Sequence, residues 1–103
     1  MKLELNDGTT MSVQANSFCY CTPRIDDASE YTAVEIGFPS KKIDLLMPYV
    51  EDASKPTDTV YAWVPTTVLA QVINNAGGVK SAANVYFKMT NVNIPLSHDY
   101  RKA

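Results

Sequence analysis

The sequence has few of the residues on which most catalytic and metal sites depend. Its 103 residues include one histidine, His98, and two cysteines, Cys19 and Cys21. A tetrahedral zinc site takes four ligands, usually Cys and His, and no such set is spaced along this chain. A Cys–His catalytic pair needs a base that is held firmly, and His98 lies in a polar C-terminal stretch. We therefore expect no catalytic residues, no metal, no cofactor and no enzymatic activity.

Glycine is also scarce, with four residues, and none of them forms a phosphate-binding loop. The pair Gly77-Gly78 precedes Lys80-Ser81, but no glycine stands directly before the lysine. These glycines also follow a predicted helix, and the C-terminal end of a helix carries the wrong end of the dipole for phosphate. The glycine fingerprint of dinucleotide-binding folds and the serine-hydrolase and zinc-protease motifs are missing too.

No apolar run approaches the roughly 20 residues that a transmembrane helix needs. The first residues, MKLELNDG, lack the apolar segment of a secretory signal. Cys19 and Cys21 are two residues apart, so in a strand their side chains share a face at a spacing that strains a disulfide. Free thiols are typical of a reducing compartment, and we expect a cytoplasmic protein.

Positive charge is not in excess, because the formal net charge is −2. Direct binding to nucleic acid or to a membrane surface usually needs clustered Lys and Arg, so we expect neither partner. The acidic residues gather in the middle third of the chain, and the C-terminal part is richer in Lys and Arg. Acids scattered through loops favour a solvated surface. An acidic patch that mimics a nucleic-acid backbone is the alternative.

The clearest structural signal is the stretch from Val60 to Gly78, which reads as a strand followed by a helix. Residues 60–64 alternate, which predicts that Val60, Ala62 and Val64 face the core while Tyr61 and Trp63 face the other way. From residue 66 the apolar spacing becomes that of one helical stripe. That stripe consists of Val68, Leu69, Val72, Ile73 and Ala76. The pattern predicts a principal helix at residues 65–76 packed on a sheet.

The remaining segments supply the other strands of that sheet. Asp7-Gly8 between two alternating runs predicts a hairpin. Residues 17–22, 31–38 and 84–96 read as further strands, the last with a bulge near Asn91. In the second of these strands, Val34, Ile36 and Phe38 are expected to face the core. Residues 79–83 read as a connection, and 43–50 as a helical turn or an extended edge segment. We expect an α+β fold, with a small antiparallel or mixed sheet of about four to six strands against one principal helix. Residues 1–96 form one domain and 97–103 a polar tail.

Two surfaces of this predicted fold are suited to binding. The sheet face opposite the helix would carry aromatic residues and a lysine, a composition enriched at interaction hot spots. The outer face of the helix carries residues without charge, where solvated helices usually carry Lys and Glu. The residues of this face are Thr66, Thr67, Ala70, Gln71, Asn74 and Asn75. The predicted binding residues are Tyr61, Trp63, Tyr86, Lys88, Gln71, Asn74 and Asn75. In the alternative interpretation, Leu45, Leu46, Met47 and Tyr49 fold over the aromatic face and make it a second core layer.

These surfaces lead to three hypotheses about function. The first is a non-enzymatic interaction protein that binds, and in one version inhibits, a host macromolecule, with a protein as the expected partner. Small accessory proteins of phages and mobile elements are of this kind. The second is a module that sequesters a small nucleotide-like ligand between the aromatic residues and Lys88. The third is a structural subunit, or a homo-oligomer, that packs through the helix face.

Overall fold

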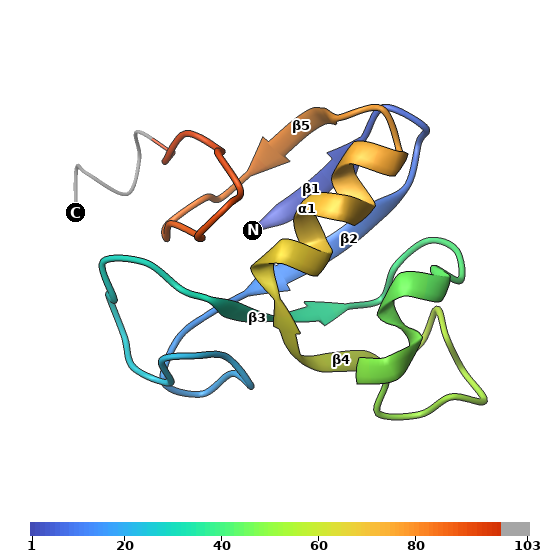
Figure 1. The fold of residues 1–103 in the computed structure, drawn as a ribbon, viewed down its shortest axis with the longest axis horizontal. Helices are drawn as coiled ribbons and strands as arrows, with labels where there is room; N and C mark the ends of the chain where they lie inside the picture. The colour runs from blue at the N-terminus through green and yellow to red at the C-terminus, as the bar shows by residue number, and fades with distance from the viewer. Residues whose placement is uncertain (98–103) are drawn as a thin grey trace.

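The computed structural model describes residues 1–97, and this range forms five strands, one α helix and one 3-10 helix (Figure 1). The strands are β1 (Lys2–Leu5), β2 (Thr10–Gln14), β3 (Ala33–Gly37), β4 (Val60–Pro65) and β5 (Val79–Ala83). The helices are η1 (Asp44–Tyr49) and α1 (Thr66–Asn75). The predicted principal helix at 65–76 is confirmed. The predicted tail is described only at Ser97, which bonds to Val85 through its backbone and its hydroxyl, and His98 lies outside the described residues.

The sheet has the order β4-β3-β2-β1-β5, and every neighbouring pair is antiparallel. The α helix crosses one face of it, and η1 lies beside β4 (Figure 1). This is the expected α+β class, with an antiparallel sheet. The predicted hairpin is present as β1 and β2, joined by a turn in which Gly8 has a φ of +90° that glycine adopts without strain.

The core lies between the sheet and α1. Leu3, Leu5 and Val13 alternate along β1 and β2 and are fully buried, as the period of two requires. Leu69 from α1 and Leu46 from η1 belong to the same buried cluster. Each such side chain contributes about 1.5–3 kcal/mol relative to exposure. Because η1 contacts both α1 and β4, it extends the helical layer over the end of the sheet.

Strand β4 differs from its predicted alternation. Tyr61 pairs with Ile36 and Val64 with Val34, so two residues of β4 oppose one residue of β3. This is a β-bulge, and Trp63 within it has a φ of +49°. The bulge reverses the phase of the strand, so that Tyr61 and Val64 are both fully buried. The prediction that Tyr61 lies on the face opposite the core is therefore wrong.

Two predicted strands do not form. Residues 17–22 are turns and bends that end in one bridge from Thr22 to Ala33, because the Asn16 side chain accepts from the Phe18 N–H and starts a turn instead. The 84–96 segment has only isolated bridges around Met89. The fifth strand is β5, which was expected to be a connection. Its sequence, VKSAA, has little apolar alternation, and pairing with β1 makes it a strand.

The buried ring of Tyr61 gives a test of this arrangement. The Tyr61 hydroxyl donates to the Pro56 carbonyl, and the ring is buried against the core. We expect Tyr61→Ala to lower the free energy of unfolding by about 3–5 kcal/mol, because it leaves a cavity. Tyr61→Phe should cost about 0.5–1.5 kcal/mol, because it removes only a hydrogen bond. Urea unfolding measures both. A larger loss for Trp63→Ala than for Tyr61→Ala would contradict the assigned orientation of β4.

Candidate functional site

The aromatic residues that were predicted to share one surface are dispersed. Tyr61 is in the core. Trp63 is 47% exposed, and its ring lies 4.8 Å from that of Tyr20, centroid to centroid. The Arg24 guanidinium carbon lies 5.1 Å from the centre of the Tyr20 ring, a cation–π distance. Trp63 therefore belongs to a small stack with Tyr20 and Arg24.

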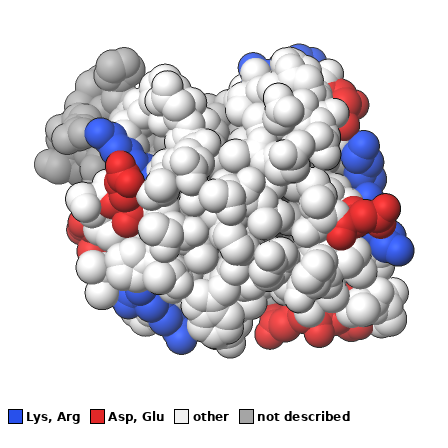
Figure 2. All heavy atoms as spheres, in the orientation of Figure 1, with Lys and Arg blue, Asp and Glu red and all other residues white. Residues whose placement is uncertain are grey.

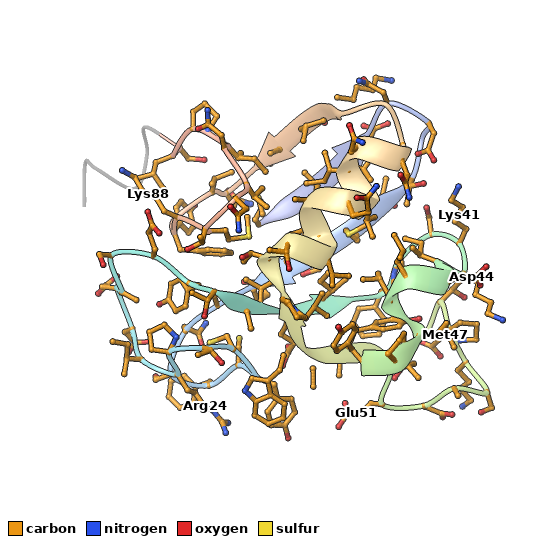
Figure 3. The ribbon with its side chains drawn as sticks, in the orientation of Figure 1. Arg24, Lys41, Asp44, Met47, Glu51 and Lys88 are labelled. Carbon is orange, nitrogen blue, oxygen red and sulfur yellow. The ribbon has the colours of Figure 1, made fainter. Side chains whose placement is uncertain are left out.

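Tyr86 and Lys88 lie at two different hollows. Tyr86 is 43% exposed, and its hydroxyl donates to the Asn84 side-chain oxygen at 3.1 Å. Lys88 lines a separate hollow with Glu30 and residues 91–96. Lys88 and Arg24 lie at two separate places on the edge of the molecule in the view of Figure 3. Among the hollows described within residues 1–97, none is lined by both Tyr86 and Lys88, the pair between which a nucleotide-like ligand was expected.

The predicted helix residues do share one surface. Gln71, Asn74 and Asn75 are exposed on α1, and the Gln71 amide donates to the Asn75 side-chain oxygen at 2.8 Å. Figure 2 shows this face of the molecule, with its centre free of charged side chains and the charges placed around the rim. Thr66, which was expected on this face, is buried, and its hydroxyl lies 3.3 Å from the Thr32 carbonyl.

A hollow of about 260 Å³ adjoins this helix surface. Ala70, Ile73 and Asn74 of α1 form one wall, and Val79 and residues 91–94 form the other. The lining residues are uncharged, so the uncharged surface continues from α1 into the hollow. The sequence pattern did not reveal it, because residues 91–94 were assigned to a strand.

A second hollow, of about 650 Å³, lies on the sheet face opposite α1. Lys2, Ser12 and Gly37 are neighbours across β1, β2 and β3 and contribute to its lining. Phe38 and Tyr86 also line it. Sequence reasoning did not find this site, because it depends on pairing between strands that are far apart along the chain.

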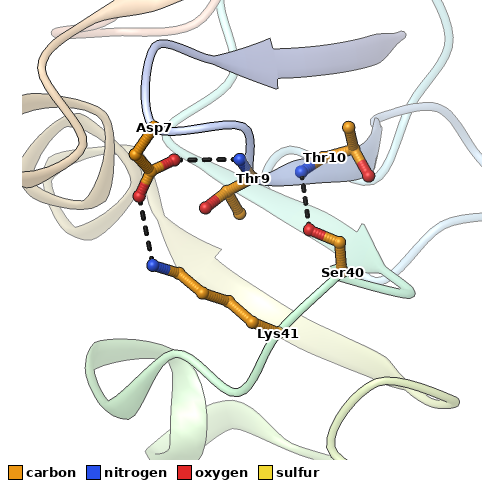
Figure 4. Close-up of polar contacts among 5 residues, drawn as sticks. All are labelled: Asp7, Thr9, Thr10, Ser40 and Lys41. Atoms are coloured by element: carbon orange, nitrogen blue, oxygen red, sulfur yellow. Dashed lines mark hydrogen bonds and ion pairs between the residues drawn. The ribbon is translucent and has the colours of Figure 1, made fainter.

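Phe38 was expected to face the core, but it is 56% exposed and has a φ of +51°. Its N–H donates to the Thr59 carbonyl at 3.0 Å, and the Ser40 N–H donates to the Thr10 carbonyl. The Ser40 hydroxyl oxygen in turn accepts from the Thr10 N–H at 2.9 Å (Figure 4). A left-handed conformation costs about 1–2 kcal/mol for a residue with a Cβ. The surrounding hydrogen bonds maintain this conformation and turn the ring away from the core.

An ion pair fastens the same segment to the β1–β2 turn (Figure 4). Asp7 accepts from the Thr9 N–H at 2.9 Å and from the Lys41 ammonium at 3.1 Å. The hydrogen bonds from Thr9, followed by the contact with Lys41, lower the pKa of Asp7 from 3.8 to about 2. The pair is exposed, so its part in stability is modest.

The cysteines are free, as expected. Cys21 is buried with its sulfur 3.2 Å from the Asn16 carbonyl oxygen, and burial raises the pKa of both thiols. Their thiolate forms are therefore disfavoured at neutral pH. Among residues 1–97 no three His, Cys, Asp or Glu side chains gather as a metal site would require. Within the same range, no helix has the length and apolar character to cross a membrane.

No protein-family model, no curated protein and no solved structure matches this chain. A functional proposal therefore rests on the geometry of the uncharged α1 surface and of the two hollows.

Strain at Phe38 leads to a prediction about stability. We expect Phe38→Asn to keep or raise the free energy of unfolding, by up to about 1 kcal/mol, because Asn tolerates the left-handed conformation. Phe87→Asn is the control, since the Phe87 ring packs edge-on against Tyr31. The control should lose about 3 kcal/mol or more. Equal losses for both variants in urea unfolding would show that Phe38 is a core residue.

The lowered pKa of Asp7 predicts a dependence on pH. The folded state favours the carboxylate, so this contribution to stability is present above pH 3.8 and is lost as the pH falls towards about 2. We expect Asp7→Asn to flatten the fall in the unfolding midpoint between these two pH values. Thermal unfolding of both proteins across this range measures the difference. Parallel curves would show that Asp7 has no depressed pKa.

Proposed function

We propose that this chain is a non-enzymatic interaction protein that binds a protein partner through the outer face of α1. The observation that carries the proposal is the uncharged surface formed by Gln71, Asn74 and Asn75, which continues into the adjoining hollow. The centres of protein interfaces are depleted in charged residues, and their rims are polar and solvated. Figure 2 has the same arrangement, with charged side chains at the edges.

The energetics of burial favour this surface. Uncharged amides and hydroxyls lose less free energy on desolvation than ions do, provided that they find new hydrogen bonds. The Gln71 and Asn75 amides already bond to each other at 2.8 Å, so they are partly ordered before a partner arrives. The hollow beside Ile73 and Val79 is large enough for one apolar side chain of a partner, which is how interface anchors are seated.

The exposed aromatic residues do not support the first form of this hypothesis, in which Tyr61, Trp63 and Tyr86 act together. Tyr61 is buried, and Trp63 and Tyr86 are in separate clusters. Any binding role of Trp63 or Tyr86 is therefore separate from that of α1.

The free cysteines bear on the compartment in which binding occurs. Two unpaired thiols persist in reducing compartments, so we place the encounter in the cytoplasm. The chain is small, and its interaction surface has no catalytic cluster. We therefore expect it to inhibit a host protein by covering part of that protein's surface, as accessory proteins of phages do.

One observation favours self-association as a second candidate function. Strand β5 ends the sheet, and among the described residues its backbone pairs only with β1. An open edge of this kind can accept a strand from another chain. A second copy paired at β5 would extend the sheet, which fits a structural subunit of a larger assembly.

The variant Asn74→Lys tests the role of the helix face. Asn74 lies in the last turn of α1, where the helix dipole stabilises a cation by about 0.3–1 kcal/mol. The variant should therefore fold, while its charge obstructs an uncharged interface. Thr57→Lys, on the exposed 51–58 loop, is the matched control.

We expect wild type and Thr57→Lys to capture the same stoichiometric protein from a lysate of the source cells. Asn74→Lys should lose it, with affinity for the purified partner reduced by about tenfold or more. Equal capture by all three proteins would contradict a role for α1. If no protein is captured and the protein alone sediments as a dimer, self-association is favoured instead.

A further inference from the structure

The hollow on the sheet face opposite α1 has the composition of a ligand site. Its volume of about 650 Å³ lies within the range of roughly 300–1,000 Å³ that is typical of small-molecule pockets. Serine, threonine and amide side chains form much of the lining, and Phe38 and Tyr86 add two exposed rings. This surface lies across the sheet from α1, so it is independent of the interface proposed above.

Space at the floor of the hollow comes from Gly37. A Cβ added there would lie 3.7 Å from the Cβ of Ser12 and 3.7 Å from a methyl of Val60, which is ordinary van der Waals contact. The backbone of Gly37 does not have a positive φ, so its conformation does not require glycine. Neither backbone geometry nor packing in the sheet therefore demands glycine, and its effect is to leave room above β3.

The ring of Phe38 is exposed at a conformational cost. More than half of its surface is in contact with solvent, and its backbone is left-handed. Strained residues of this kind cluster at binding sites, where the surrounding structure maintains them. The second ring, Tyr86, is oriented by its hydrogen bond to Asn84. Both rings offer apolar faces on which a ligand can stack.

The polar groups match a neutral ligand. Ser12 and Gln14 are hydrogen-bonded to each other at 3.1 Å, and both side chains can donate and accept. Lys2 and the Met1 ammonium are the charged groups of the lining residues, and this ammonium donates to the Val13 carbonyl at 2.9 Å. Glu4 and Glu35 occupy the same sheet face by alternation, and Glu4 pairs with Lys80 at 3.7 Å. A phosphate would therefore meet carboxylates as well as cations, whereas a neutral ligand meets no charge repulsion.

The sheet itself limits which neutral ligand can bind. Backbone N–H and C=O groups of β1, β2 and β3 are used in pairing with neighbouring strands. A peptide laid over this face would have only side chains to bond to, and its own backbone groups would be poorly satisfied. Saccharide rings carry C–H faces that stack on aromatic rings and hydroxyls that both donate and accept, which matches the groups present.

We propose that this hollow binds a neutral oligosaccharide, with one sugar ring stacked on Phe38 above Gly37 and its hydroxyls bonded to Ser12, Gln14 and Asn84.

A glycan array tests the proposal. The array carries neutral oligosaccharides of glucose, galactose, mannose and N-acetylhexosamines, beside sialylated, sulfated and phosphorylated glycans. We expect wild type to retain neutral glycans, and calorimetry with the best-retained one gives its Kd. Gly37→Val should weaken that Kd by about tenfold or more, because the added side chain occupies the floor while valine suits a strand. Phe38→Asn should have a similar effect without loss of thermal stability.

Matched controls separate this site from the other surfaces. Ala53→Val adds a similar side chain on the exposed 51–58 loop, and Phe18→Asn removes an exposed ring that does not line the hollow. Both should bind glycan as wild type does. Asn74→Lys should also keep glycan binding, so a failure of the α1 interface would leave this result intact.

Three outcomes would overturn the proposal. The first is an array on which no neutral glycan is retained. The second is retention of charged glycans alone, and the third is binding that Gly37→Val leaves unchanged. Saturable binding of an extended peptide from a peptide array, lost in Gly37→Val, would assign the hollow to a different class of ligand.

Discussion

The bulge in β4 is the constraint on which the two sides of this molecule depend. Two residues of β4 oppose one residue of β3, so Tyr61 and Val64 both enter the core and Trp63 leaves it. Without the bulge, regular alternation would place Tyr61 on the same face as Trp63. The core would then lose its largest side chain from β4, and the Tyr61 hydroxyl would not reach the Pro56 carbonyl that it anchors.

The left-handed backbone of Phe38, directly after β3, also changes the direction of a side chain. Phe38 follows Gly37 with a φ of +51°, and Trp63 has a φ of +49°. The positive φ of each residue places its aromatic ring in solvent. Regular strand geometry would have turned each ring in a different direction. The apolar face of the sheet is covered by α1 and η1, while the exposed rings lie outside that core. One face of the domain thus supports α1 and its uncharged surface, and the other carries the hollow above Gly37.

Periodicity in the sequence was sufficient for the parts of the fold that follow regular geometry. The apolar stripe of α1 and the alternation in β1, β2 and β3 predicted elements that are present. Segments with irregular backbone were missed, because a bulge or a positive φ reverses the phase of a pattern without changing its composition. Tyr61 and Phe38 are both errors of this kind. The uncharged face of α1 could be predicted because it is local, whereas the hollow needs three paired strands.

Hydroxyl-radical footprinting of the native protein tests the orientation of these side chains most directly. Tyr61 and Tyr86 have the same intrinsic reactivity, so their oxidation rates compare burial alone. We predict that Tyr86, Phe38 and Trp63 are oxidised in the folded protein, while Tyr61 is protected until the protein unfolds. Oxidation of Tyr61 as fast as that of Tyr86, together with protection of Phe38, would contradict the bulge in β4 and the hollow on the opposite sheet face.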